Sequence, residues 1–347
     1  MERSINEKEN ALRALKRTGD VQWVPSDSVA LEVIVASKMF ERPPRDCHGM
    51  PLFTDEGKLV DDKDWFGVKW FFDDDSSGFA PDIKSPYVLD DITEWRDVVK
   101  FPDVDSIDWE ATAKEDLASC DTENRLSVLF VESGPFERMH HLMGFENTFI
   151  SMAEEPEEFR ALADAIGDYK ANLLDHMLST YKPDMVLVHD DLGSAKGPFF
   201  SLDMYRELLK PAHMKIGETI DKYDVIHMHH SCGYMQTFIP DLLETGVDGF
   251  HPVQSCNNRA EVAKTYSDQA CFWISIDAAL DGDNSEEAVR NEVRSVIDTF
   301  GPYKNFVIGS IPNKYNERQR NWVADEVAKY GGSYYEGKQA AKAMSAC

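Results

Sequence analysis

Several features that define whole classes of protein are missing from this chain of 347 residues. It has no apolar run of about 18 residues, the length that a membrane-spanning helix needs. Its opening, MERSINEKENALRALKRTGD, is charged and lacks the apolar core of a secretory signal. Its 6 cysteines follow no disulfide framework spacing, as is typical of reduced thiols. We therefore expect a cytoplasmic protein that has no role at a membrane.

Positive charge is also scarce. Lys and Arg together number 36 against 63 Asp and Glu, which gives a formal net charge of −27. Such a chain repels phosphate backbones and anionic lipid, so binding to nucleic acid is not expected. A glycine-rich phosphate loop after an early strand is missing as well, which disfavours an open doubly wound sheet.

From residue 126 onward, short apolar runs alternate with helical patterns. We expect these runs to be strands, at 126–131, 184–189, 225–230, 247–253, 271–276 and 306–311. This alternation predicts βαβ units and a parallel sheet. Two further strands could lie upstream, one of them at 22–25, and eight strands would close a barrel. The predicted fold is therefore α/β, a (β/α)8 TIM barrel.

The first part of the chain has a different pattern. Residues 65–72 alternate like a hairpin strand, and an acidic, turn-rich loop follows them. No low-complexity linker separates this part from the rest. We predict a single domain over 1–347, in which residues 1–110 form an N-terminal elaboration covering one end and residues 111–347 supply the main barrel units.

Polar side chains follow the predicted strands. In a parallel barrel the reactive residues lie at the C-terminal ends of the strands, so we expect these side chains to surround one mouth. They are Glu132, His189, Asp190, Asp191, His230, Cys232, His251, Gln254, Cys256, Asp277 and Ser310.

The motif H-S-C-G at 230–233 is the most specific of these features. An H-x-C pair can place an imidazole nitrogen and a thiolate on one Zn²⁺ ion. The alternative is a buried histidine beside an inert buried cysteine. His227 and His229 fall on the other face of the strand and should point away from the mouth.

The H-S-C-G motif, the apolar helix after it and GVDGFHPVQ at 246–254 together resemble the uroporphyrinogen decarboxylase superfamily. Within it the chain is most similar to the corrinoid-dependent methyltransferases, which include the methyltransferase components of O-demethylases and methylcobalamin:coenzyme M methyltransferases. Five more segments carry this likeness, at 63–70, 92–103, 132–147, 189–213 and 321–331.

This resemblance implies an enzyme that moves a methyl group from a methyl ether, an aromatic one in particular, to the Co(I) corrinoid (cobalamin) of a partner protein. Zn²⁺ held by His230, Cys232 and Cys256, or an acid such as Glu132 or Asp191, would activate the leaving oxygen. The small-molecule methyl donor would lie against side chains that include Phe136, Phe199, Phe250, Trp273, Gln254 and Asp277. The corrinoid would arrive on a separate protein, because the chain has no D-x-H-x-x-G cobalamin loop. The enzyme could form a homodimer.

Two departures from the superfamily leave alternatives open. Coenzyme M methyltransferases take a third zinc ligand from a Gly-Cys pair, where this chain has Gly309 and Ser310, so Cys256, Glu132 and Asp191 are candidates for that position. The decarboxylases carry an arginine- and glycine-rich loop that this chain lacks. The alternatives are a methylcobalamin:thiol methyltransferase, a decarboxylase of the uroporphyrinogen type and a non-catalytic binding protein of a corrinoid system.

Overall fold

The computed structural model describes residues 4–73, 78–277, 285–309 and 317–336. One sheet of seven parallel strands forms the centre of the fold, in the order β1-β4-β5-β8-β9-β10-β11. All six strands predicted from residue 126 onward are present, each within its predicted run. The strands are β1 (Leu31–Ile34), β4 (Leu126–Val131), β5 (Met185–His189), β8 (Ile226–His230), β9 (Gly249–His251), β10 (Cys271–Ile274) and β11 (Phe306–Ile308).

The two edges of this sheet meet beside Ser26. Ser26 forms a parallel bridge with Ile308 of β11, and the Ile308 N–H donates to the Pro25 carbonyl at 3.0 Å. Only α2 (Asp27–Ala30) separates Ser26 from β1, so the sheet curls into a ring. The prediction of a TIM-barrel fold is confirmed. Residues 22–25, predicted as a possible upstream strand, do not form a strand. Pro25 lacks the N–H that hydrogen bonding between strands requires, so this segment contacts the sheet only at its end. The upstream strand is β1.

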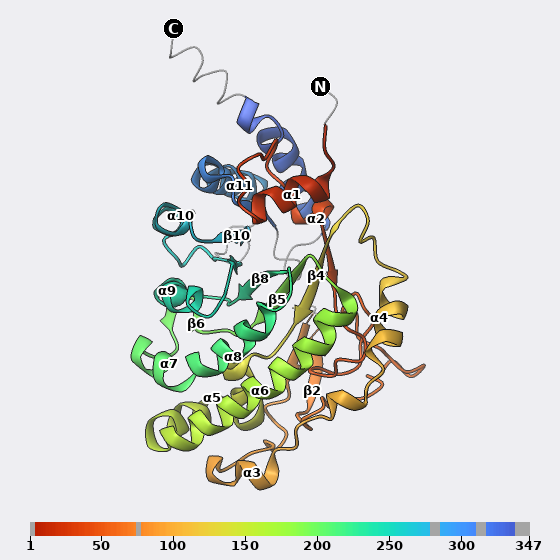
Figure 1. Cartoon of the computed structure of the whole chain (residues 1–347), viewed down its shortest axis with the longest axis vertical. Coiled ribbons are helices and arrows are strands. Elements are labelled where there is room, and N and C mark those ends of the chain that lie inside the picture. The colour runs from red at the N-terminus through yellow and green to blue at the C-terminus, as the bar shows by residue number, and fades with distance from the viewer. Residues whose placement is uncertain (1–3, 74–77, 278–284, 310–316, 337–347) are drawn as a thin grey trace.

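Helices cover the outside of the ring, as Figure 1 shows. They pack on the alternate strand residues that point outward, such as Val186, Phe250 and Phe272, in one continuous apolar layer. The helices along the barrel are α5 (Pro135–Glu154), α6 (Pro156–Tyr181), α7 (Leu202–Leu208), α8 (Lys210–Ile220), η3 (Gln236–Phe238), α9 (Ile239–Leu243), α10 (Arg259–Tyr266), α11 (Glu286–Phe300), η4 (Gly301–Tyr303), α12 (Glu317–Glu326) and η5 (Val327–Gly331). None of the helices in the described parts is long and apolar enough to cross a membrane.

The interior of the barrel holds a second, smaller apolar cluster. Inward-facing residues such as Leu126, Met185 and Met228 pack there against Ala11 and Leu15 of α1 (Glu7–Leu15). Helix α1 lies at the upper end of the molecule in Figure 1 and closes the end at which the strands begin. The opposite end, where the strands finish, is therefore the one that can hold a site.

Residues 35–73 and 78–108 extend from that opposite end. They include the antiparallel hairpin β2 (Trp70–Asp73) and β3 (Gly78–Pro81), with η1 (Ile92–Glu94), α3 (Trp95–Val98) and η2 (Val104–Ser106), and α4 (Trp109–Leu117) leads back to β4. In Figure 1, β2 and α3 lie far from α1. A second small hairpin, β6 (Gly193–Ser194) with β7 (Gly197–Pro198), follows β5.

Buried ion pairs fix this segment on the barrel. Arg138 of α5 contacts Glu41 at 2.8 Å and Asp64 at 2.6 Å, and Lys170 of α6 also contacts Glu41 at 2.8 Å. All four side chains are almost completely excluded from solvent. Because a buried charge without a partner costs several kcal/mol, about 3–5 for a broken pair, these contacts specify one docked position.

Candidate active site at the barrel mouth

Three histidines from neighbouring strands lie in one row across the sheet. His189 of β5 pairs in register with His230 of β8, and His230 pairs with His251 of β9. Residues two positions earlier on β5 and β8, Leu187 and Met228, belong to the interior cluster, so the histidines also face inward. The row therefore lies inside the C-terminal mouth, as the sequence predicted for strand-end residues.

The rings of this row are in contact. His189 stacks on His230 with centroids 3.8 Å apart, and His251 lies 4.3 Å from Trp273 of β10. His230 and His251 approach through their Nδ1 atoms at 2.7 Å. Burial lowers the pKa of both His230 and His251, the latter to about 3, so both rings are neutral.

His189 is the charged member of the row. Its Nδ1 lies 2.8 Å from Oε2 of Glu137, in the first turn of α5. Burial by itself would lower the pKa of His189, but the Glu137 carboxylate outweighs it and raises that pKa to about 9. An imidazolium therefore stacks on the neutral ring of His230 at neutral pH.

Asp190 holds α5 against the end of β5. Its carboxylate is fully buried and accepts the N–H groups of Phe136 and Glu137 and a hydrogen bond with Nε2 of His213. Gly134 has to be glycine, because a Cβ there would lie 2.4 Å from the Asp190 side chain. Asp190 thus caps the helix that carries Glu137, and it has a positioning role.

His230 contacts both Cys232 and Asp191. The His230 Nε2 atom lies 3.4 Å from the Cys232 sulfur and 3.6 Å from the Asp191 carboxylate, which also accepts the Cys232 N–H at 2.6 Å. Gly233 continues the chain with a φ of +71°, a conformation that favours glycine. Burial raises the pKa of Asp191 to about 7, against the lowering effect of His189.

His230 with Cys232, and His230 with Asp191, have separations that suit two ligands of one zinc ion, but the Cys232 sulfur is not in the group of ligand atoms at His230 that all lie within 4.8 Å of one another. Tetrahedral zinc with Zn–N and Zn–S bonds of about 2.0 and 2.3 Å places its ligand atoms about 3.5 Å apart, close to the separations found here. His189, Asp191 and His230 also offer ligand atoms within 4.8 Å of one another. The cationic state of His189 makes it a poor ligand, however, so the described residues provide His230 with either Cys232 or Asp191 as a ligand pair rather than a complete set of three.

Glu132 lies beside this site but is engaged elsewhere. Its carboxylate forms ion pairs with Arg45 and, at 3.8 Å, with Arg42, and both arginines come from the N-terminal elaboration. Burial acts to raise the pKa of Glu132, but the two arginines dominate and lower it to about 2. Glu132 is therefore ionised, and of the two acids predicted from the sequence Asp191 is the better proton donor.

Gln254 and Asp277 shape the loops around the mouth. The Gln254 side-chain oxygen accepts the Gly233 N–H at 2.5 Å. Asp277 accepts the Ser255 N–H and pairs with Arg259 at 2.7 Å. Cys256 lies in the same loop, half-buried, and does not belong to the group of ligand atoms at His230 among the described residues. Ser310 lies outside the described residues.

The predicted aromatic residues divide into two groups. Phe250 points outward and packs on Phe272 in the layer under the helices, and Phe136 is fully buried against Phe199 and Phe200. These side chains belong to the apolar core. Trp273 and Phe130 face the barrel interior instead and contact His251 and His189, so they form the aromatic wall of the mouth.

Some residues of the site were not singled out as site residues in the sequence. Glu137 and the arginine pair Arg42 and Arg45 contact it from segments that precede or follow the strands. The position of Glu137 in the first turn of the helix after β4 is a local signal that could have identified it. No local pattern indicates that Arg45 lies next to Glu132, which is 87 residues away.

A parallel barrel with acid–base and ligating side chains gathered at the C-terminal mouth is the architecture of a barrel enzyme. The family profile described as uroporphyrinogen decarboxylase (URO-D) matches residues 66–310. The chain belongs to the uroporphyrinogen decarboxylase family.

One relative of this chain and one solved structure of similar fold are methyltransferases. The methylated-thiol--coenzyme M methyltransferase of Methanosarcina mazei is 25% identical over 128 residues, which are 37% of this chain and 33% of that protein. The match thus spans about a third of the length of that relative. A solved structure, a methyltransferase from Methanosarcina mazei, superposes with a TM-score of 0.67 at 13% identity, over 94% of this chain and 99% of that one. The resemblance inferred from the sequence motifs is confirmed.

Proposed function

We propose that this protein is a corrinoid-dependent methyltransferase that moves the methyl group of an aromatic methyl ether to the Co(I) corrinoid of a partner protein. The observation that carries the proposal is the contact of His230 with both Cys232 and Asp191 at the mouth of the barrel. Family membership and the methyltransferase relatives support the type of reaction.

The reaction breaks the bond between the methyl carbon and the ether oxygen. The carbon bonds to the corrinoid, a co-substrate that supplies the nucleophile, and the departing oxygen needs a proton or a Lewis acid. A zinc ion held by His230 together with Cys232 or Asp191 would supply the Lewis acid. In the absence of zinc, Asp191 donates the proton, because its pKa of about 7 leaves part of it protonated at neutral pH.

The other side chains of the mouth position these groups. Glu137 holds His189 as a cation beside the leaving oxygen, where its charge favours a developing phenolate. Trp273 and Phe130 offer ring faces to an aromatic substrate. Side chains from β4, β5, β8, β9 and β10 thus act on one small volume.

A methylated thiol is the second candidate substrate, favoured by the similarity to the methylated-thiol--coenzyme M methyltransferase of Methanosarcina mazei. A thiolate leaves without protonation far more readily than an alkoxide, so such a reaction makes less use of a protonated Asp191. Decarboxylation is less well supported. A substrate with many carboxylates needs uncompensated cations, whereas Arg42 and Arg45 are paired with Glu132.

The test uses the purified protein with free cobalamin reduced to Co(I). We expect the protein to be colourless as purified and to form methylcobalamin, followed by its absorption spectrum, when a methoxybenzoate is added. A Cys232→Ala variant is the control for the site. Transfer from a methyl thioether but not from the methoxyarene would replace the first candidate by the second, and stoichiometric cobalamin retained through purification would contradict delivery by a partner.

A further inference from the structure

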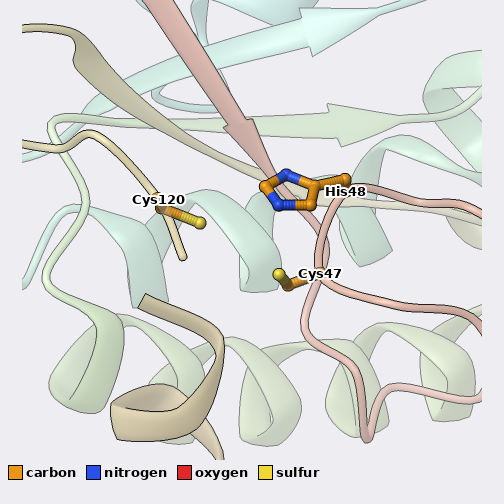
Figure 2. Close-up of side chains that lie close together, drawn as sticks. All are labelled: Cys47, His48 and Cys120. Carbon is orange, nitrogen blue, oxygen red and sulfur yellow. The ribbon is translucent and has the colours of Figure 1, made fainter. Parts of the chain in front are cut away.

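A second group of ligating side chains lies away from the mouth. Among the described residues, Cys47, His48 and Cys120 each offer a ligand atom, and these atoms lie within 4.8 Å of one another. Figure 2 shows the two sulfur atoms turned toward a common space, with the imidazole ring beside them. Cys47 is buried, Cys120 is half-buried and His48 is exposed.

Hydrogen bonds hold the two loops of this group in place. The Cys47 carbonyl accepts the Val35 N–H at 2.9 Å, just after β1, and Asp46 accepts the His48 N–H at 2.9 Å. On the other side the Cys120 thiol donates to the Asp116 carbonyl at 3.3 Å, at the end of α4. The ligand atoms therefore converge on a backbone that is already ordered.

We propose that Cys47, His48 and Cys120 bind a zinc ion, whose fourth position is taken by water or by Ser119. Two thiolates and one imidazole are typical zinc ligands, and this soft donor set disfavours magnesium and calcium. The Ser119 hydroxyl lies 3.2 Å from the Cys47 sulfur and 3.5 Å from His48 Nε2, so an oxygen is already at the edge of the site. The residues of this site take no direct part in the proposed reaction.

The ion would join two segments that are far apart in the sequence. Cys47 and His48 belong to the N-terminal elaboration, whereas Cys120 lies between α4 and β4. Arg45, two residues before Cys47, pairs with Glu132 just after β4. Zinc would therefore hold the loop that brings Arg45 to the mouth, a structural role that reaches the active site through one ion pair.

The experiment counts zinc in protein that is freed of metal by a chelator under reducing conditions. The Cys232→Ala variant removes the proposed zinc at the mouth, so zinc that this variant still binds reports on the second site. We expect Cys232→Ala to bind one zinc ion, and Cys232→Ala with Cys120→Ser to bind none. Cobalt(II) in place of zinc should give a thiolate-to-metal absorption band in the first protein and not in the second.

His48→Ala provides a variant that leaves the core intact, because this side chain is exposed. It should weaken zinc binding at the second site by at least about tenfold, whereas His176→Ala, a histidine elsewhere on the surface, should leave it unchanged. Failure of Cys232→Ala to bind zinc or cobalt would overturn the proposal. So would a Cys47–Cys120 disulfide that forms while zinc is present in excess. Neither result bears on methyl transfer, which is measured separately.

Discussion

His230 and His251 meet nitrogen to nitrogen, with their Nδ1 atoms 2.7 Å apart on neighbouring strands. Because both rings are neutral, one Nδ1 must donate its hydrogen to the other. When His230 donates, its Nε2 atom carries the lone pair and faces Cys232 at 3.4 Å. His251 can therefore set the tautomer in which His230 binds a metal ion.

Replacement of His251 should weaken zinc binding at the mouth. For His251→Leu we expect affinity to fall by about 10–100-fold, the usual effect of losing the hydrogen-bond partner of a ligating histidine. Zinc affinity is measured by competition with a chromophoric chelator in a Cys120→Ser background, which lacks the second site. The matched control is His227→Leu, on the outward face of β8, the strand that carries His230, and we expect its affinity to be unchanged. Equal affinity in both variants would remove His251 from this role.

Cys232→Ala should lose zinc at the mouth and activity together. A thiolate shares the binding energy of the ion with few other ligands, so its removal weakens affinity severely. We expect a folded protein, by circular dichroism, in which methyl transfer falls at least about 100-fold. His227→Ala should keep both zinc and activity. If Cys232→Ala holds no zinc at the mouth yet is fully active, Asp191 alone activates the leaving oxygen.

The substitution Asp191→Asn separates the chemical role of the Asp191 carboxylate from its role in packing. The amide keeps the size of the side chain and can still accept the Cys232 N–H, but it neither carries charge nor donates a carboxyl proton. We expect a loss of about 10²–10⁴-fold in kcat for a methyl ether, with a thermal midpoint close to that of the unchanged protein. A methyl ether turned over at the original rate by Asp191→Asn would exclude Asp191 as either acid or zinc ligand.

The strands after residue 126 could be predicted because each is a short apolar run bounded by polar text. Helix α5, the first barrel helix after β4, could not be predicted from the sequence. Helix α5 buries side chains all round, from Phe136 and Arg138 to Met139 and Leu142, and Gly144 interrupts it with a φ of +77°. A helix covered on several sides has no single apolar stripe to give a period of 3.6.

The residues of the candidate site also include some that the sequence could predict and some that it could not. His230, Cys232 and Asp191 follow their strands directly, so the alternation of strands and helices brings them to one mouth. The ionised state of Glu132 depends on Arg42 and Arg45, whose contact with it is made by the docked N-terminal elaboration. Strand alternation also decides that Phe250 points away from the mouth while His251 points into it, which composition alone does not reveal.

The pair of His189 and Glu137 predicts a loss of stability at alkaline pH. The folded state raises the pKa of His189 from its ordinary 6.5 to about 9. A raised pKa stabilises the fold fully below the unfolded value, and this stability is lost as the pH rises through the folded value. Between pH 7.5 and 9.5 we therefore expect the free energy of unfolding to fall by about 1–2 kcal/mol through this group.

Urea unfolding of the unchanged protein and of His189→Gln at these two pH values measures this effect. Burial also raises the pKa of thiols such as Cys271, to about 12, so these groups lower stability near the upper end of the range as well. They are present in both proteins, so they cancel in the difference between the two. His189 holds down the pKa of Asp191, which is about 7 in the unchanged protein and rises in His189→Gln, so part of the Asp191 titration enters this range in the variant and the difference between the two proteins is a lower bound for His189. The same fall in both proteins would show that His189 is neutral in the folded state, and the cation in the histidine row would then have to be abandoned.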